Sequence, residues 1–278
     1  MRKLVLLLLL AATPSFAGIT YTAETRTILG AKDSNGDFRV QGWVSGNRAR
    51  MEFLYSALPQ LETGTYLVSS DGGNTVYFVN PKEKTFELWD ISGMISNMAD
   101  MMRSMRGEMR VRFEEPKVEK LLEEDGPKIH NLPTRHYRFR TSYRASIDMY
   151  DTETINTVTE EDIWTTNAIS EPGVKIFLDR RMSSGDEQLD RILDKEMSKV
   201  IGFPLRRLTT TRQETKKEVT ETRSEMNIVE LKTVDVADSI FEVPKGYTQE
   251  DPNESGLERG LKKLERDQKE QQKQQQPQ

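Results

Sequence analysis

Apolar and polar side chains alternate with a period of two through much of this 278-residue chain, and this alternation limits the fold more than any other feature. It begins at Ile19, Tyr21 and Ala23 and continues through residues 37–45 and 48–55. Successive side chains of a β-strand point to opposite faces of its sheet, so the pattern is typical of strands that bury one face. Short polar turns, including an Asn-Gly pair and an Asp-Gly-Gly-Asn run, separate the segments. The first third of the chain is therefore predicted to form an antiparallel meander of six short strands.

The same alternation returns in the second half of the chain. Strands are predicted at residues 107–113, 135–150, 160–169, 203–213 and 217–234. The polar stretch 114–128 lacks the pattern and is interpreted as a loop or a weak strand. Counting both halves, we expect roughly ten strands.

Two segments follow a helical period instead. In residues 91–105, five Met side chains recur at the spacing of one helix face. In residues 186–202, six aliphatic or Met side chains share a face, Asp186 is a suitable N-cap, and Gly202 is a suitable C-cap. The chain is therefore predicted to be mainly β with two helices (α+β), in the order strands, helix, strands, helix, strands.

The two ends of the chain differ in composition from the part between them. Residues 1–17 carry Arg2 and Lys3, then an apolar run of nine residues, then small residues up to Ala17. This pattern predicts a secretory signal peptide cleaved after Ala17. Spanning a bilayer takes about 20 apolar residues, so we expect no transmembrane segment in the mature chain. Residues 249–278 are rich in Gln, Lys and Glu and predict a disordered or frayed helical tail, which leaves one domain at 18–248.

Composition excludes several classes of function. The chain has no Cys, two His and a formal net charge of −5. The lack of Cys rules out disulfides and Cys-ligated metals, and an acidic chain is a poor partner for nucleic acid. No nucleophile elbow, P-loop or dinucleotide-binding glycine motif is present in the sequence. We therefore expect a protein that is not an enzyme and that uses no cofactor or metal. We expect it to reside in a bacterial periplasm, because an exported protein of this size without Cys fits that compartment better than the extracellular space of eukaryotes, where disulfides are usual.

Three polar groupings receive ordinary structural interpretations. The run 33–37 resembles the start of a calcium loop, but Phe38 stands where such a loop needs Gly, so a hairpin turn is favoured. His130 and His136 lack the spacing of a metal site and are expected to be surface residues. The acidic residues 160–162 lie on a predicted strand, so neighbouring carboxylates face opposite ways and are expected to be solvated.

The Met-rich segment is the least usual feature, because six of the twelve Met residues lie between positions 94 and 109. Three interpretations stay open. The Met side chains pack a helix against the core, or they form an adaptable lid over a groove that accepts lipid. In the third, their thioethers bind Cu(I).

A groove is indicated by two predicted strands, 66–68 and 76–79, that are apolar on both faces. A strand with one wet face alternates cleanly, so these strands have both faces covered, or one face lines a dry cavity. The groove would hold a lipophilic ligand. The candidate ligand-binding residues are Trp43, Met51, Phe53, Tyr66, Phe78, Phe86, Trp89, Met94, Met98, Met101, Met102 and Met105.

Arginine residues gather on the predicted strands of the C-terminal half. They are Arg135, Arg138, Arg140, Arg144, Arg206, Arg207 and Arg212. A face with several guanidinium groups binds carboxylates or lipid phosphates. Alternatively, each Arg pairs across strands with one of the many Glu residues.

Three parts of the sequence resemble the periplasmic lipoprotein-carrier (LolA-like) superfamily and its domain-of-unknown-function relatives. They are the paired hairpin at residues 66–90, the run 202–207 after an amphipathic segment, and the ending Phe241-x-Val243-Pro244-x-Gly246-Tyr247. The resemblance implies a curved antiparallel half-barrel closed by two helices. It also implies an apolar concave face that accepts the acyl chains of lipoproteins or other lipophiles.

The leading hypothesis is a non-enzymatic periplasmic binding protein that holds a lipophilic ligand, an acyl chain or lipoprotein lipid, in an apolar groove. The alternative is an envelope scaffold or stress-sensing module that binds a protein partner and no small ligand. The third is Met-based Cu(I) handling.

Overall fold

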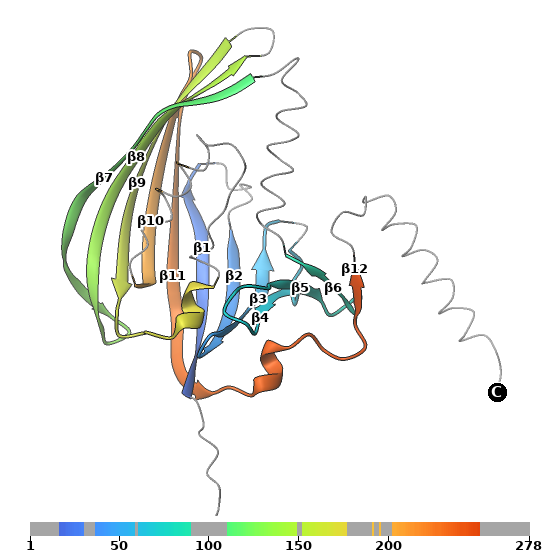
Figure 1. The fold of residues 1–278 in the computed structure, drawn as a ribbon. Helices are drawn as coiled ribbons and strands as arrows, with labels where there is room; N and C mark the ends of the chain where they lie inside the picture. Colours follow the sequence, from blue (N-terminus) through green and yellow to red (C-terminus); the bar gives the residue numbers. More distant parts are fainter. Residues whose placement is uncertain are drawn as a thin grey trace, which may run out of the picture.

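The computed structural model describes residues 17–30, 37–58, 61–89, 110–148, 152–176, 191, 195 and 202–250. Within these residues, twelve strands form one sheet (Figure 1). The first six are β1 (Ala17–Leu29), β2 (Phe38–Ser45), β3 (Arg48–Ser56), β4 (Tyr66–Ser69), β5 (Tyr77–Asn80) and β6 (Thr85–Leu88). The others are β7 (Arg110–Ile129), β8 (Leu132–Asp148), β9 (Thr152–Thr166), β10 (Phe203–Glu214), β11 (Val219–Asp235) and β12 (Thr248–Glu250).

The sheet consists of two meanders that join at its middle. Strands β1 to β6 follow one another outward to one side, and β7 to β11 follow one another inward from the opposite edge. The two meanders meet where β1 pairs antiparallel with β11, with Ala17 opposite Asp235. The last strand, β12, pairs parallel with β6, whereas all other neighbours pair antiparallel. The six-strand N-terminal meander expected from the sequence is confirmed.

The expected fold class is wrong. The sequence predicts an α+β half-barrel of roughly ten strands covered by two helices, but the structure is nearly all β and forms one open sheet of twelve strands. Helical backbone in the described residues is limited to two 3₁₀ turns, η2 (Pro172–Lys175) and η3 (Asp238–Phe241), and to Arg191 and Lys195. Of the segments predicted as helices, residues 91–105 and nearly all of 186–202 lie outside the described residues.

Strand β7 extends well past the predicted strand at 107–113, because it includes the polar stretch interpreted as a loop or weak strand. This strand pairs with β8 along most of its length, with three shifts in register. Charged side chains accompany the pairing, including an Arg135 Nη2–Glu123 Oε1 ion pair of 3.2 Å and an Arg144 Nη1–Glu114 Oε2 pair of 3.8 Å between the two strands. Backbone pairing and ion pairs hold this strand in place without the apolar alternation that reveals a strand in a sequence.

Hydrophobic side chains are buried on both faces of the N-terminal meander. One face carries the larger cluster, which includes Val40, Val44, Phe53 and Leu205. We call it the cavity face, because a cavity lies on it. The other face carries a smaller cluster of Tyr66, Val68, Val79 and Phe241, with Phe241 supplied by η3. All four residues of β4 are buried, which agrees with the first of the two alternatives for this strand, that both of its faces are covered.

Candidate functional site

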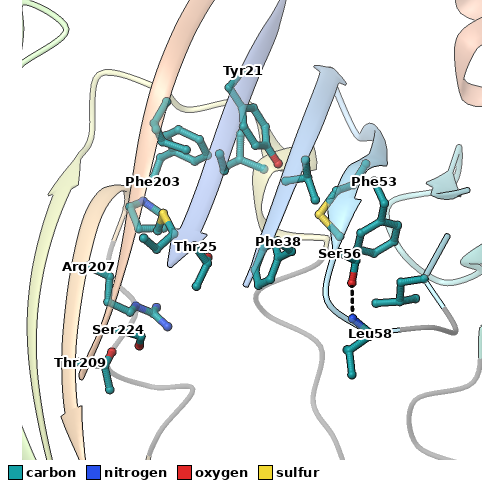
Figure 2. A pocket seen from close by; sticks show the side chains of 18 residues that line it. Tyr21, Thr25, Phe38, Phe53, Ser56, Leu58, Phe203, Arg207, Thr209 and Ser224 are labelled. Carbon is teal, nitrogen blue, oxygen red and sulfur yellow. Dashed lines mark hydrogen bonds between the residues drawn. The ribbon is translucent and has the colours of Figure 1, made fainter. Parts of the chain in front are cut away.

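A cavity of about 500 Å³ lies on the cavity face, over the middle of the sheet (Figure 2). Volumes of roughly 300 to 1,000 Å³ are typical of small-molecule sites. Strands from both meanders contribute to it, together with η2 and the segment after β3. Its lining residues are Tyr21, Ala23, Thr25, Phe38, Val40, Met51, Phe53, Ser56, Leu58, Leu61, Val174, Phe203, Pro204, Arg207, Thr209, Ser224, Met226 and Ile228.

Breaks in strand register occur beside this cavity. Shifts in register leave one extra residue on each of three strands: Val229 on β11, Leu54 on β3 and Leu205 on β10. A β-bulge bends its strand and increases the local twist. Three bulges close to the lining residues therefore bend this part of the sheet, which leaves a hollow on the cavity face.

An aromatic pair lines the cavity beside a glycine. The ring of Tyr21 lies so close to Gly42 that a Cβ atom on Gly42 would stand 2.2 Å from the Tyr21 Cζ. The ring of Phe203 meets Tyr21 edge to face, with centroids 5.3 Å apart. Burial raises the pKa of Tyr21 to about 12, because the phenolate would lose its hydration there. The lack of a side chain on Gly42 is therefore what lets Tyr21 lie against the sheet.

The turn η2 closes one side of the site through a fixed attachment to the β2–β3 hairpin. Gly173 N donates a hydrogen bond of 2.8 Å to Gly46 O, and Gly46 N donates one of 2.9 Å to the Glu171 carboxylate. A Cβ on Gly173 would stand 2.6 Å from Arg48 O, so glycine is required for this approach. The attachment places Val174 against the cavity, so the segment that follows β9 contributes to the site.

One end of the cavity is polar. Arg207, Thr209 and Ser224 lie together there in Figure 2, away from Phe38, Phe53 and Leu58. Arg207 and Thr209 are two positions apart on β10 and so share a face, and Thr209 pairs directly with Ser224 of β11. Arg207 is the one charged side chain among the described residues that line the cavity.

Arg207 differs from Arg138, Arg140 and Arg206 in its face and in its partner. On β8, β9 and β10, Arg138 Nε lies 2.9 Å from Asp162, and Arg140 and Arg206 each lie 2.6 Å from a Glu carboxylate on a neighbouring strand. These pairs lie on the face opposite the cavity and support the cross-strand interpretation of the arginines. Arg207 faces the cavity, and its Nη1 lies 3.9 Å from Glu161 Oε1. Its Nε is buried and has no hydrogen-bond partner in the described structure.

The acidic run 160–162 divides between the two faces, as the alternation predicts. Asp162 and Glu160 pair with arginines on the face opposite the cavity. Glu161 is only 8% exposed and lies on the cavity face near Arg207, so the expectation that it is solvated is wrong. The sequence gives no sign of this burial, because burial of Glu161 depends on the register of β9 with β8 and β10.

The two histidines do not meet. His130 Nε2 contacts Ile228 O at 2.7 Å. His136 is 8% exposed, stacks on Trp164 and contacts Asp162 Oδ1 at 2.6 Å, so it is not the surface residue that we expected. In the described ranges, no group of three or more His, Cys, Asp or Glu side chains is placed to hold a metal ion.

The predicted ligand-binding residues are distributed over several places. Met51 and Phe53 line the cavity. Phe78 and Trp89 pack against each other, with centroids 5.5 Å apart, and against the cluster on the cavity face. Trp43, Tyr66 and Phe86 belong to the cluster on the opposite face. The five Met residues lie outside the described part of the chain, and with them the lid and Cu(I) interpretations: Met94, Met98, Met101, Met102 and Met105.

Most of the cavity lining was not among the predicted residues. Tyr21 and Val40 lie on the same face as Met51 and Phe53, the predicted residues of β3. Alternation shows this phase in the sequence of β1 and β2. For Phe203 no such signal exists, because nothing in the sequence shows that β11 pairs with both β1 and β10 and so brings Phe203 close to Tyr21.

The face opposite the cavity is covered by the segment that follows β11. Phe241 of η3 is 2% exposed and packs with Tyr66, Val68 and Val79, with Val243 and Tyr247 beside it. After this segment the chain enters β12, which pairs with β6. The ending that carried the family resemblance thus covers the short strands β4 to β6 on the side away from the cavity.

No helix in the described ranges is long and apolar enough to cross a bilayer. Comparison of the chain with models of known protein families gives no match, and comparison with curated proteins gives none either.

Proposed function

We propose that this protein is an exported, non-enzymatic binding protein that holds a lipophilic ligand in the cavity on its sheet. The observation that carries the proposal is the hollow of about 500 Å³, which is lined mainly by apolar side chains and left open by the described residues. Burying apolar ligand surface there would contribute about 25 cal/mol per Å². The resemblance of the chain to lipoprotein carriers and the signal-like residues 1–17 support the same proposal.

The first test asks whether the purified protein carries a ligand. The protein is extracted with organic solvent, and the extract is analysed by mass spectrometry. A lipid recovered in molar proportion to the protein supports the proposal. A clean extract, together with failure of the delipidated protein to bind palmitic acid or its methyl ester, contradicts it and favours the scaffold or sensing module. The N-terminal sequence tests export, since a start at Gly18 supports cleavage after Ala17 and a start at Met1 contradicts it.

A pair of variants on one strand locates the ligand. Thr25 lines the cavity, whereas the neighbouring Arg26 is 72% exposed and points to the other face. Thr25→Phe fills part of the cavity and is expected to lower the recovered lipid and the affinity of the delipidated protein for it. Arg26→Phe adds the same ring outside the cavity and is expected to leave both unchanged. Equal loss in the two variants would place the ligand elsewhere.

A further inference from the structure

We propose that the ligand of this cavity is a free fatty acid, whose carboxylate is bound by Arg207, Thr209 and Ser224. This inference rests on the proposed function and adds to it the chemistry of the ligand's polar end. Its basis is that one guanidinium and two hydroxyl groups gather at one end of a cavity whose other walls are mainly apolar.

The hydrogen bonds of Arg207 are incomplete. A guanidinium carries five N–H donors, and the one ion pair recorded for Arg207 engages Nη1 at a long 3.9 Å. Nε and Nη2 form the opposite edge of the group, and Nε is buried without a partner in the described residues. The side chain as a whole is 30% exposed, so its end reaches open space. If the Arg207 side chain rotates towards the cavity, an oxygen atom of a ligand there can accept hydrogen bonds from Nε and Nη2.

The two hydroxyl groups extend the same site. Thr209 and Ser224 pair across β10 and β11. This pair is two residues along the strands from the pair of Arg207 with Met226, so both pairs lie on the same face. Neither hydroxyl has a recorded hydrogen bond to another described residue. Two hydroxyl donors and the planar edge of a guanidinium suit a carboxylate, which accepts through two oxygens. Met226 and Phe203 line the cavity next to this polar end, where the acyl chain would begin.

Glu161 is the competing group, because its carboxylate already lies near Arg207. The pair is loose, and a fatty acid carboxylate would replace the distant contact with direct hydrogen bonds. Like charges repel, so the negative charge of Glu161 weakens the binding of an anion. Glu161→Gln is therefore expected to raise the affinity for a fatty acid and to leave the affinity for a neutral ester unchanged.

The test compares palmitic acid with methyl palmitate in binding to the delipidated protein at neutral pH. The two probes share an acyl chain and differ in the charge of the head. Hydrogen bonds to a charged group are worth about tenfold or more in affinity. We expect the protein to bind the acid about tenfold more tightly than the ester, and Arg207→Gln to remove that preference while keeping ester binding.

The matched control is the neighbouring Arg206, which faces away from the cavity and pairs with Glu225 at 2.6 Å. Arg206→Gln is expected to leave both affinities unchanged, and Arg207→Lys is expected to restore part of the preference. Equal binding of acid and ester by the parent protein overturns the carboxylate assignment but keeps the proposed function. Equal loss of both probes in Arg207→Gln also overturns it, since that result shows a structural role. Failure of both probes with the parent overturns the inference, and together with a clean solvent extract it overturns the proposed function as well.

Discussion

Adding one methyl group at Gly42 tests whether Tyr21 packs against the sheet as described. The new Cβ would stand 2.2, 2.4 and 2.7 Å from three atoms of the Tyr21 ring. Carbon atoms prefer to be about 3.5 to 4.0 Å apart, so the ring must move by more than 1 Å, roughly the shortfall in the closest contact. Phe203 packs edge to face against Tyr21, and the cavity is the open space beside the ring. Gly42→Ala is therefore expected to push Tyr21 towards the cavity.

Two opposing terms set the size of the effect. Overpacking costs typically about 1 to 3 kcal/mol. Replacing glycine by alanine in a strand stabilises by about 0.5 to 1 kcal/mol, because the unfolded chain loses freedom. Because three contacts would be far shorter than normal, the cost lies in the upper part of that range. The net expectation is a loss of about 1 to 2.5 kcal/mol in the free energy of unfolding, together with weaker ligand binding.

Urea denaturation of a double-mutant cycle measures this contact. In a Tyr21→Ala background the ring is gone, so Gly42→Ala is expected to become neutral or stabilising. The difference between the two backgrounds is the coupling between Gly42 and Tyr21. A neutral or stabilising effect of Gly42→Ala in the parent protein would refute the packing of Tyr21 on Gly42.

Two further predictions concern pH and the C-terminal segment. Because burial raises the pKa of Tyr21 to about 12, its contribution is fully present below pH 10 and is lost as the pH rises towards 12. The free energy of unfolding of the parent relative to Tyr21→Phe should therefore fall by up to about 3 kcal/mol over that range, and a flat difference would contradict the burial. Phe241→Ala should cost about 3 to 5 kcal/mol in urea denaturation, since its ring is 2% exposed, and a loss below about 1 kcal/mol would show that η3 does not hold the segment in place.

The sequence predicts strands well where one face is apolar and fails where other forces hold the strand. The hairpins of β1 to β6 are visible as alternation interrupted by turn residues. The long β7 is hidden, because its middle is charged and its partner is β8 rather than a hydrophobic layer. The two helical patterns indicated covering helices, and the described residues contain none.

The site was harder to predict than the strands, because each strand has two faces and alternation does not say which one holds the cavity. Phe53 and Trp43 lie on the same hairpin and were both assigned to the groove. The register places Phe53 on the cavity face and Trp43 on the other, under the segment that carries Phe241. The segment that carries Phe241 covers one face of this hairpin, although it lies almost two hundred positions later in the chain. The other face stays open, and its cavity depends on the long-range pairing of β1 with β11.

The pairing of β1 with β11 also sets the order in which this molecule can be completed. Ala17 and Asp235 come from opposite ends of the described chain, and their strands form the seam between the two meanders. Contacts between distant residues form slowly, because a long loop must close before they yield any stabilisation. Nearly every described residue must be synthesised before β1 can pair with β11. During synthesis the two meanders are therefore not joined, and the cavity between them cannot form.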